Sequence, residues 1–426
     1  MKTTTTSLLL AGSLVSGGVA YGNAFNVNEH DAKSSGRGGA TAATNTSASS
    51  VVFNPGGIPV GEGTQVAINA SLYITQGFYE PDGGGARVKT DTGPTPVPAI
   101  YLTSRVHDMV GVGVALHFPF GASISWPDGH PQRGTLTDQA LRTYFITPSV
   151  GINLDKQVPG LSFGGGVDLV PATVLLKRDV VFGDTEGTAE LGGDAFGIGG
   201  RGGIMYHPPA LKQLSVGVMY RSQVTLDFEG KGDFDIAQPY RDQLPPDGDI
   251  TTSITLPQQV WAGVAVRPIP ELELELDGVW IDWSKFKELR IQLPADQVTV
   301  APQNYEDKLT VRFGAEYSIN KQAAVRAGFV YDPTPIPDTT QTAQLPDADR
   351  INVALGGSYK FTPDYGLHLG FLWVTPQDRE TSDALYTPTY KGTYGVQAFV
   401  ASLMFSATFG GKAAPDPMPE PMVAKK

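Results

Sequence analysis

The sequence predicts an all-β protein: a transmembrane antiparallel β-barrel of about fourteen strands. Three observations lead to this prediction. Strand-like segments alternate between apolar and polar residues, and the connections between them alternate between short and long. Beyond the N-terminal region there is no apolar run of the roughly 20 residues that a membrane-spanning helix needs, which excludes a helical membrane protein but not a barrel.

The alternation is clearest in residues 272–283, which read Leu-Glu-Leu-Glu-Leu-Asp-Gly-Val-Trp-Ile-Asp-Trp. Leucines occupy positions 272, 274 and 276 and carboxylates occupy 273, 275 and 277, so a strand would separate an apolar face from an anionic one. The next segment, residues 309–317, places Arg312 on its polar face, where we expect the guanidinium to meet those carboxylates. A soluble sheet with its charged face in water has the same pattern. This pair of segments alone therefore does not distinguish a membrane barrel from a soluble sheet.

The lengths of the connections favour the barrel. We expect strands to begin near Gln65, Pro96, Met109, Arg142, Leu161, Ala195, Leu214, Thr252, Leu272, Lys308, Ala323, Arg350, Tyr365 and Tyr394. Short turns are predicted at 104–108, 155–160, 207–213, 267–271, 318–322 and 361–364, and long loops at 80–95, 119–141, 177–194, 222–250, 284–307, 332–349 and 375–393. Outer-membrane barrels alternate short periplasmic turns with long extracellular loops, and a soluble sandwich has no reason to do so.

Four parts are predicted along the chain. Residues 1–22 are a secretory signal peptide, because Lys2 precedes a short apolar region that ends in Ala20-Tyr21-Gly22. Residues 23–63, rich in Gly, Ala, Ser and Thr, are the segment that we call the hatch. Residues 64–409 form the barrel, and residues 410–426 are a Pro-rich periplasmic tail that cannot join a ladder. Export, strands and the absence of Cys together indicate the Gram-negative outer membrane.

Composition argues against several other classes of protein. The formal charge of −12 disfavours nucleic acid as a partner, because binding phosphates requires clustered Lys and Arg. The six His residues are scattered without metal-ligand spacing, and no Gly-x-Ser-x-Gly motif occurs, so we predict no metal, no cofactor and no enzymatic activity. His117 and His368 lie on expected strands and could face a Ser, as in a barrel phospholipase, but lone strand histidines are more often structural.

Several motifs follow one another in the order known from one family. They are residues 24–29 (Ala-Phe-Asn-Val-Asn-Glu), Asn54-Pro55-Gly56, Pro119-Phe120-Gly121, Tyr220-Arg221-Ser222, Trp283-Ser284-Lys285-Phe286, residues 329–337 and residues 345–350. The ordered series, spread over nearly the entire mature chain, resembles the FadL-type long-chain fatty acid transporters of the outer membrane, a family that includes aromatic-hydrocarbon carriers. The second motif departs from the family's Asn-Pro-Ala by one residue, since Gly replaces Ala.

The resemblance implies an architecture and a transport route. It implies a fourteen-stranded barrel, plugged by the hatch, that captures a hydrophobic substrate among its extracellular loops. The substrate would pass to an interior pocket beside the hatch and leave sideways through a gap in the wall. The expected partners are fatty acids or other hydrophobic small molecules, with outer-membrane lipid and lipopolysaccharide around a monomer. The alternative is a general porin or a structural or adhesive barrel, and a plug before the first strand favours the transporter.

The resemblance also assigns roles to individual residues. Phe25 matches an aromatic residue that lines the family's pocket, and Leu176 matches an apolar pocket residue. Arg178 matches the arginine that faces the substrate carboxylate, for which a guanidinium offers a bidentate fork. Asn54-Pro55-Gly56 matches the hatch turn, and Gly203 matches a small residue bordering the lateral gap.

One family feature is missing from this sequence. The family's second basic pocket residue aligns with Ala301, so a specific requirement for fatty acids is in doubt and neutral hydrophobic compounds stay open. The residues themselves leave two alternatives open: Arg178 as a plain cation at the rim, and Gly203 as a plain strand glycine.

Overall fold

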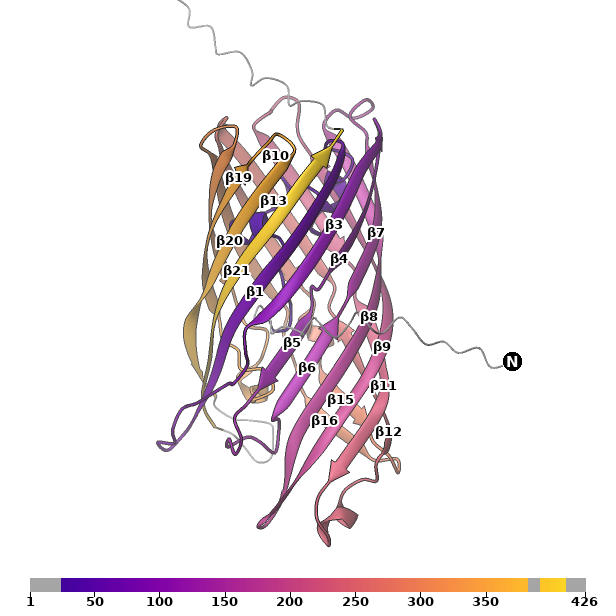
Figure 1. The fold of residues 1–426 in the computed structure, drawn as a ribbon, viewed down its shortest axis with the longest axis vertical. Helices are drawn as coiled ribbons and strands as arrows, with labels where there is room; N and C mark the ends of the chain where they lie inside the picture. The colour runs from indigo at the N-terminus through magenta and orange to yellow at the C-terminus, as the bar shows by residue number, and fades with distance from the viewer. Residues whose placement is uncertain (1–23, 382–390, 411–426) are drawn as a thin grey trace, which may run out of the picture.

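The computed structural model describes residues 24–381 and 391–410, which form one closed antiparallel barrel (Figure 1). The predicted signal peptide, the Pro-rich tail after residue 410 and part of the predicted loop 375–393 lie outside the described residues. The wall has 14 strands. It closes where the last strand pairs with the first, from Thr64 opposite Phe409 to Pro81 opposite Gly392. The predicted fold class, an all-β barrel of about fourteen strands, is confirmed.

Eight strands of the wall are single elements and six are interrupted once. The single elements are β1 (Thr64–Pro81), β3 (Thr95–His107), β8 (Leu161–Phe182), β9 (Thr185–Tyr206), β18 (Ala323–Asp332), β19 (Arg350–Lys360), β20 (Tyr365–Glu380) and β21 (Gly392–Phe409). The interrupted ones are β4 (Val110–His117) with β5 (Gly121–Ser125), β6 (Asp138–Thr143) with β7 (Phe145–Asn153), β10 (Leu214–Arg221) with β11 (Val224–Asp235), β12 (Gly248–Leu256) with β13 (Gln259–Ile269), β14 (Leu272–Ile281) with β15 (Glu288–Gln292), and β16 (Val298–Pro302) with β17 (Lys308–Ser318). A short strand, β2 (Val88–Lys89), pairs with β1 beyond the rim.

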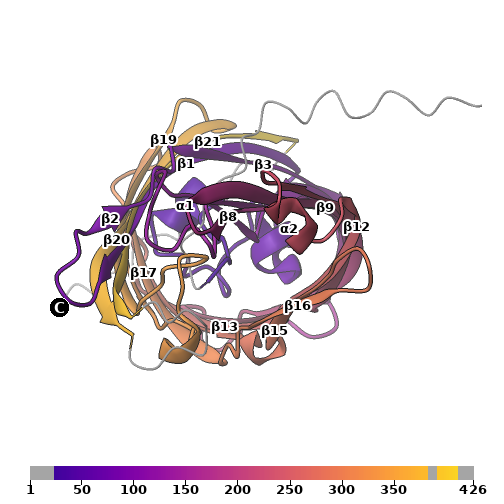
Figure 2. The same ribbon diagram turned by 90° about the horizontal axis from the view of Figure 1, so that it is seen from below.

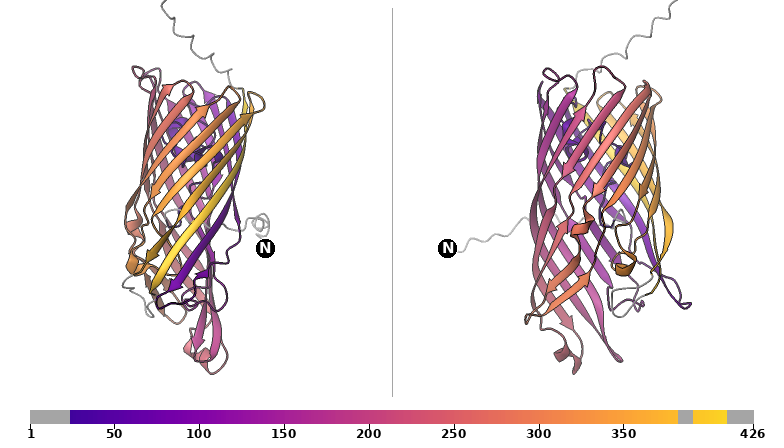
Figure 3. Two further views of the ribbon diagram at one scale, coloured as in Figure 1. Left: turned by 90° about the vertical axis from the view of Figure 1, so that its left-hand side faces the viewer. Right: turned by 180° about the vertical axis from the view of Figure 1, so that it is seen from behind.

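The main errors of the sequence analysis lie at the long-loop end. The predicted loop 177–194 is instead the continuation of β8 and β9, so the strand expected near Ala195 begins at Thr185. The predicted loops 119–141, 222–250 and 284–307 likewise contain strands, and β8, β9, β11 and β12 extend far along the barrel axis (Figure 3).

The polarity of the two faces explains these errors. In the band expected to face lipid, apolar side chains point outward, as Leu276 does with 55% of its surface exposed. In β11 the order is reversed, since Leu226 and Phe228 are buried whereas Asp227 and Glu229 are exposed. A membrane strand is recognised by the apolar side chains along its outward face, and the reversal removes them. Side chains still alternate between the two faces with a period of two residues.

The hatch fills the lumen of the barrel. Residues 24–63 precede β1 and include α1 (Ala32–Ser35), α2 (Ser50–Phe53) and the 3₁₀ turn η2 (Pro55–Gly57), which lie inside the ring of strands (Figure 2). Three further 3₁₀ turns lie in the connections: η3 (Tyr240–Gln243), η4 (Trp283–Lys285) and η5 (Asp338–Thr340). None of the helices in the described part of the chain is long and apolar enough to cross a membrane.

The anionic face of β14 holds the hatch backbone. Asp277 accepts hydrogen bonds from the backbone N–H groups of Thr41 and Ala42, at 2.8 and 3.0 Å. Glu275 accepts the N–H of Ala43 at 2.6 Å. Hydrogen bonds to a charged acceptor are stronger than neutral ones, and buried N–H groups are costly when left without a partner. The alternation first noticed in the sequence therefore serves to bind the hatch.

A buried ion-pair network strengthens the same contact. Arg37 of the hatch donates to Glu273 at 2.7 Å and to Glu275 at 3.1 Å. The arginine and Glu275 are both buried. A buried charge is tolerated only when it is paired, so hatch and wall are electrostatically matched here.

The expected neighbour of these carboxylates, Arg312, contacts the hatch directly. The register places it opposite Asp277, which confirms the predicted pairing of the two strands. Its guanidinium nevertheless donates to the carbonyl oxygen of Gly38 at 3.1 Å and lies 5.1 Å from the ring centroid of Trp261. The two strands therefore pair as predicted, but the expected contact was wrong: among the described residues the guanidinium bonds to the hatch and forms no ion pair with those carboxylates.

Glycines in the wall let the hatch approach the strands closely. A Cβ atom added to Gly217 would lie 2.0 Å from the carbonyl oxygen of Ala42, and one added to Gly164 would lie 2.2 Å from that of Pro55. Since real Cβ atoms essentially never come so close, the hatch backbone fits only against a wall without side chains at these two positions.

We expect Leu276→Arg to lower the free energy of unfolding by ~2 to 4 kcal/mol if the residue lies at the bilayer midplane. Ile269→Arg, at the end of β13, is the matched control and should cost only ~0 to 1 kcal/mol. Equilibrium unfolding in lipid vesicles measures both. Equal costs at the two positions would mean that this band does not face hydrocarbon.

The double change Glu275→Gln and Asp277→Asn should loosen the hatch while the barrel stays folded. Each charge-assisted hydrogen bond weakened is worth up to ~1.5 to 3 kcal/mol, and five hatch groups donate to the pair. Single-channel recording in planar bilayers should then show transient water-filled openings. Asp249→Asn, which removes an exposed carboxylate of β12 that pairs with Lys231, is the control, and openings at the same frequency in both proteins would contradict the assignment.

Candidate functional site

An aromatic cluster surrounds the beginning of the hatch. The ring centroid of Phe25 lies 4.7 Å from that of Trp283, 5.7 Å from Phe286 and 6.1 Å from Phe120. Tyr305 completes the cluster, with its centroid 5.9 Å from Trp283 and 5.0 Å from Phe286. Edge-to-face packing of this kind suits aromatic rings at such distances. The five residues are called the aromatic cluster below.

The cluster lies where wall strands are interrupted. Phe120 lies between β4 and β5, Trp283 and Phe286 lie between β14 and β15, and Tyr305 lies between β16 and β17. A side chain in a regular strand can only point to one face or the other, whereas a break lets a loop carry its ring into the lumen. Two of the motifs quoted from the sequence, those containing Phe120 and Trp283, therefore mark breaks in the wall.

The hatch itself supplies backbone partners at the first of these breaks. The N–H of Val27 donates to the carbonyl oxygen of Pro119 at 2.8 Å, and the N–H of Gly121 donates to that of Phe25 at 2.9 Å. Pro119 has no N–H and cannot continue an ordinary ladder. The start of the hatch therefore runs antiparallel to the break and satisfies backbone groups that the wall leaves open there.

A small apolar cavity adjoins the aromatic cluster. Its volume is about 80 Å³. It is lined by Phe25, Ala122, Gln139, Ala140, Leu141, Val174, Leu176, Thr252, Ile254, Phe286, Leu289, Gln303, Tyr305, Gln344 and Leu345. The structure thus brings together Phe25 and Leu176, which are 151 positions apart in the sequence, in one predominantly apolar wall.

Arg178 lies outside this cavity. It follows Leu176 by two positions on β8, opposite Ala189 of β9, and its side chain is exposed. Its expected contact with a substrate carboxylate stays a prediction. Ala301, where the family's second basic residue was expected, packs partly buried against the hydrophobic core.

The hatch turn is anchored from both sides. The amide nitrogen of Asn54 donates to the carbonyl oxygens of Ala42 at 2.7 Å and Ile204 at 3.1 Å, while its side-chain oxygen accepts the N–H of Gly56 at 3.0 Å. Ser162 of β8 donates to the carbonyl oxygen of Gly56 at 2.8 Å. These bonds fix the turn to the wall and to the rest of the hatch.

Gly203 lies against this turn. A Cβ atom there would be 2.1 Å from the side-chain oxygen of Asn54. Gly203 pairs with Gly164 of β8 and with Met219 of β10, so the wall is continuous on both sides of it. A role at a lateral gap stays a prediction for this residue, and its observed contact is with the hatch.

A gap in the ladder lies between β3 and β5 instead. β3 pairs with β4 from Ile100 to His107, whereas β5 pairs with β6, and no pairing of residues 95–99 with β5 occurs within the described chain. A cavity of about 30 Å³ lies there. It is lined by Val27, Pro96, Val97, Pro98, Phe118, Phe120, Gly121, Leu141, Arg142, Thr143 and Tyr144. Phe120 thus borders both this cavity and the aromatic cluster.

A buried ion pair lies beneath the cluster. Arg201 donates from Nη2 to the Oδ1 atom of Asp168 at 2.7 Å, and from Nη1 to the carbonyl oxygen of Val52 at 3.1 Å. Thr147 donates to the same carboxylate at 2.6 Å, and the Nε2 atom of His117 lies 3.2 Å from Arg201. Both charged side chains are fully buried. This arginine is therefore held by the protein itself.

His30 of the hatch faces the same region. Its Nδ1 atom lies 3.0 Å from the hydroxyl of Tyr101. Burial, together with the positive charges of Arg221 and Arg201, lowers the pKa of His30 to about 3. The imidazole is therefore neutral near pH 7 and adds no further positive charge.

Sequence reasoning did not single out Arg221, the last residue of β10. Its guanidinium carbon lies 4.6 Å from the ring centroid of Phe120 and 5.8 Å from that of Phe145. The only signal was its place in the Tyr-Arg-Ser motif, and nothing in that motif shows that the side chain is buried.

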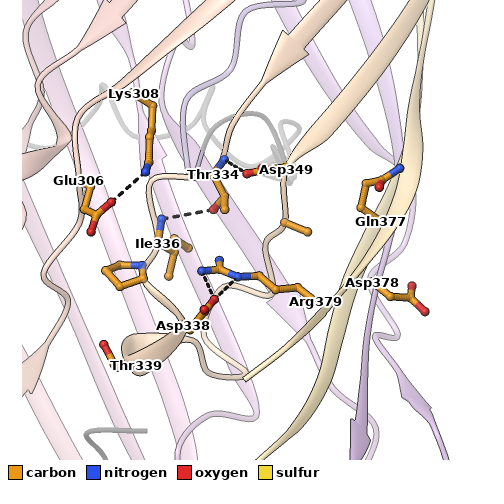
Figure 4. Close-up of a pocket in the computed structure, with 12 residues that line it drawn as sticks. Glu306, Lys308, Thr334, Ile336, Asp338, Thr339, Asp349, Gln377, Asp378 and Arg379 are labelled. Carbon is orange, nitrogen blue, oxygen red and sulfur yellow. Dashed lines mark hydrogen bonds and ion pairs between the residues drawn. The ribbon is translucent and has the colours of Figure 1, made fainter. Parts of the chain in front are cut away.

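A larger cavity, of about 650 Å³, lies among the connections at the long-loop end (Figure 4). Charged residues line it, including Asp349, Asp378 and an ion pair between Asp338 and Arg379. Lys308 donates to Glu306 at 2.8 Å at its edge. Its charged lining suits water better than an apolar molecule. In the described part of the chain, no group of three or more His, Asp or Glu side chains is placed to hold a metal ion.

Comparisons with known proteins agree with this architecture. Residues 13–409 match the family described as outer membrane protein transport protein (OMPP1/FadL/TodX). A long-chain fatty acid transport protein of Escherichia coli O6:H1 is 25% identical over 418 residues, covering 88% of this chain and 91% of that protein. Outer membrane protein P1 of Haemophilus influenzae is 23% identical over 429 residues, covering 88% of this chain and 90% of that protein.

Solved structures share the fold. A FadL homologue of Pseudomonas aeruginosa superposes with a TM-score of 0.80 at 16% identity, covering 91% of this chain and 100% of that chain. The toluene transporter TbuX of Ralstonia pickettii gives a TM-score of 0.70 at 17% identity, covering 91% and 99%. Because the family match includes nearly the whole barrel and the hatch, the resemblance inferred from the ordered motifs is confirmed: the chain belongs to the OMPP1/FadL/TodX family of transport proteins and is a β-barrel of the Gram-negative outer membrane.

Proposed function

We propose that this protein carries long-chain fatty acids or other hydrophobic small molecules into the outer membrane, by capture among the loops, passage through the interior cavity and lateral release. The observation that carries the proposal is the apolar cavity beside Phe25, bounded by the aromatic cluster, in a barrel whose lumen also holds the hatch. The protein would act as a monomer surrounded by lipid and lipopolysaccharide.

An apolar cavity provides the driving force for such a substrate. Each methylene group moved from water to an apolar site contributes ~0.8 kcal/mol. An acyl chain or an aromatic ring therefore gains from entering the cavity and gains nothing from a watery pore. The relatives whose names mention long-chain fatty acids and toluene support this class of substrate.

The cavity as it stands is closed. Sites that bind small organic ligands measure roughly 300–1,000 Å³, whereas this one measures about 80 Å³. Phe25 is the lining residue best placed to move, because it belongs to the start of the hatch and not to the wall. Withdrawal of its ring would join the cavity to the space beside Phe120.

The gap between β3 and β5 provides the lateral exit in this proposal. The ladder is absent there, so a molecule can pass without breaking wall hydrogen bonds. Backbone hydrogen bonds of the hatch at Pro119 and Gly121 close the break from inside. A shift of the Phe25 end would therefore open the pocket and the exit together.

A general porin is the alternative function. Against it stands the hatch, which is bound to the wall by Glu275 and Asp277 and fills the lumen. A hydrolase is a weaker alternative, suggested by His368, whose ring nitrogens lie 2.5 Å from Ser358 and 2.8 Å from Ser406. With a serine at each nitrogen, this histidine lacks the link to a carboxylate that orients the base of a catalytic triad.

Two deletions test the proposal. Removal of residues 23–28 should abolish saturable uptake of oleate and toluene yet leave a folded barrel, because it removes Phe25 but keeps the anchored hatch turn. Removal of residues 23–57 should open a steady water-filled conductance, because the polar inner wall is then exposed.

Cell uptake assays and single-channel recording measure the two effects, and heat-modifiable migration on gels reports folding. The intact protein should also release bound fatty acid or hydrocarbon detectable by mass spectrometry after extraction. If both deletions leave uptake and conductance unchanged, the hatch has no part in transport and the proposed route fails.

A further inference from the structure

Arg221 is buried without a partner for much of its guanidinium. The side chain is 5% exposed. Its Nε and Nη2 atoms are buried and have no hydrogen-bond partner among the described residues, and none of the carboxylates described forms an ion pair with it. It ends β10 at the break before β11, at the level of the aromatic cluster.

The surroundings do not neutralise this charge. Asp168 attracts Arg221, but this carboxylate is already bonded to Arg201 through Nε and Nη2 and to Thr147. Arg201 adds a second positive charge nearby. His30 is neutral near pH 7, because burial and the two arginines lower its pKa to about 3.

A structural role explains Arg221 poorly. The contact with the Phe120 ring, 4.6 Å from the guanidinium carbon, is a cation–π interaction that offsets only part of the cost of burying a charge. Arg201, in the same protein and next to it in the ladder, shows what a structural arginine looks like here: its donors reach a carboxylate and a backbone carbonyl. Arg221 is buried like Arg201 but lacks the hydrogen-bond partners that Arg201 has.

Arg221 lines neither apolar cavity in the closed structure, but it contacts a ring that lines one of them. Phe25 lines the cavity beside the aromatic cluster, Phe120 lines the cavity between β3 and β5, and the two rings are 6.1 Å apart. Arg221 stacks on Phe120 from the lumen side of the wall. A molecule that displaced the rings of Phe25 and Phe120 on its way between the cavities would therefore come close to this guanidinium.

We propose that Arg221 is the anion-binding residue of the transport path, which takes the carboxylate of a fatty acid while the acyl chain lies against the aromatic cluster. This inference rests on the proposed function and adds to it a preference for acids over neutral hydrophobic compounds. A guanidinium binds a carboxylate through two parallel hydrogen bonds, and the low dielectric of a buried site strengthens them. Arg178, whose side chain is exposed rather than buried, is then not the source of the preference.

Binding of matched ligands to purified, delipidated protein in detergent tests the proposal. Oleate and methyl oleate share one chain and differ in charge, and acetate supplies the carboxylate without the chain. At pH 8 the intact protein should bind oleate about tenfold or more tightly than the ester, the scale of a charge-assisted hydrogen bond. Acetate should bind far more weakly than either, which shows that chain and anion are recognised together.

Three variants locate the preference. Arg221→Met should remove it, by weakening oleate about tenfold or more while leaving methyl oleate nearly unchanged. Arg221→Lys keeps the charge and should retain most of the preference. Arg178→Met tests the rival arginine, to which the family resemblance assigns the carboxylate, and should retain all of the preference if Arg221 binds the anion. Migration on gels with and without heating shows which variants fold.

Several results would overturn the inference. These are equal binding of oleate and its ester by the intact protein, an unchanged preference in Arg221→Met, an equal loss of both ligands in that variant, or a preference that vanishes in Arg178→Met. The first and last do not depend on the folding of any Arg221 variant. Failure of the intact protein to bind either long-chain ligand would instead refute the proposed function.

Discussion

The contact between the carboxylates of β14 and the hatch backbone is the interaction on which the rest of the structure depends. A plug inside a barrel brings backbone N–H groups into a lumen that has little water, and each must find an acceptor. Asp277 and Glu275 accept three of them, at Thr41, Ala42 and Ala43. Since the strand that supplies these acceptors faces lipid on its other side, one run of twelve residues, 272–283, both seals the wall and positions the plug.

A closed barrel solves the problem of unsatisfied strand edges, but it also leaves an apolar molecule no way through the wall. Under the proposed function, the interrupted strands would resolve this conflict. Aromatic side chains such as Phe120 and Trp283 enter the lumen at the breaks, and the hatch supplies the hydrogen bonds that the break at Pro119 forgoes. Those bonds come from the N-terminal end of the plug and not from a neighbouring strand. The same end of the plug therefore both closes the wall at Pro119 and places Phe25 in the aromatic cluster.

The sequence was sufficient for the fold wherever one face of a strand is apolar and turned toward lipid, as in residues 272–283. It was misleading in β11, where the exposed face carries Asp227 and Glu229 and the outward apolar stripe is lost. The site could be predicted only in part. Phe25 and Leu176 followed from the family resemblance, whereas the burial of Arg221 depends on Phe120, which lies 101 positions earlier in the chain. The alternation of apolar and polar residues within one strand shows which side chains face inward. It cannot show that the ring of Phe120, at a break far away in the sequence, lies against the inward-facing guanidinium of Arg221.

Phe25 lines the small apolar cavity in the closed structure, so under the proposed function its ring would compete with the substrate for that space. A ligand shifts such an equilibrium only by the difference between its affinities for the two states. An acyl chain replaces the ring contacts of Phe25 with contacts of similar kind, and this exchange by itself favours opening only weakly. A carboxylate that reaches Arg221 adds an interaction absent from the closed state, where part of the guanidinium has no partner. The buried charge is therefore the feature that would let a fatty acid, more than a hydrocarbon of equal length, displace the hatch.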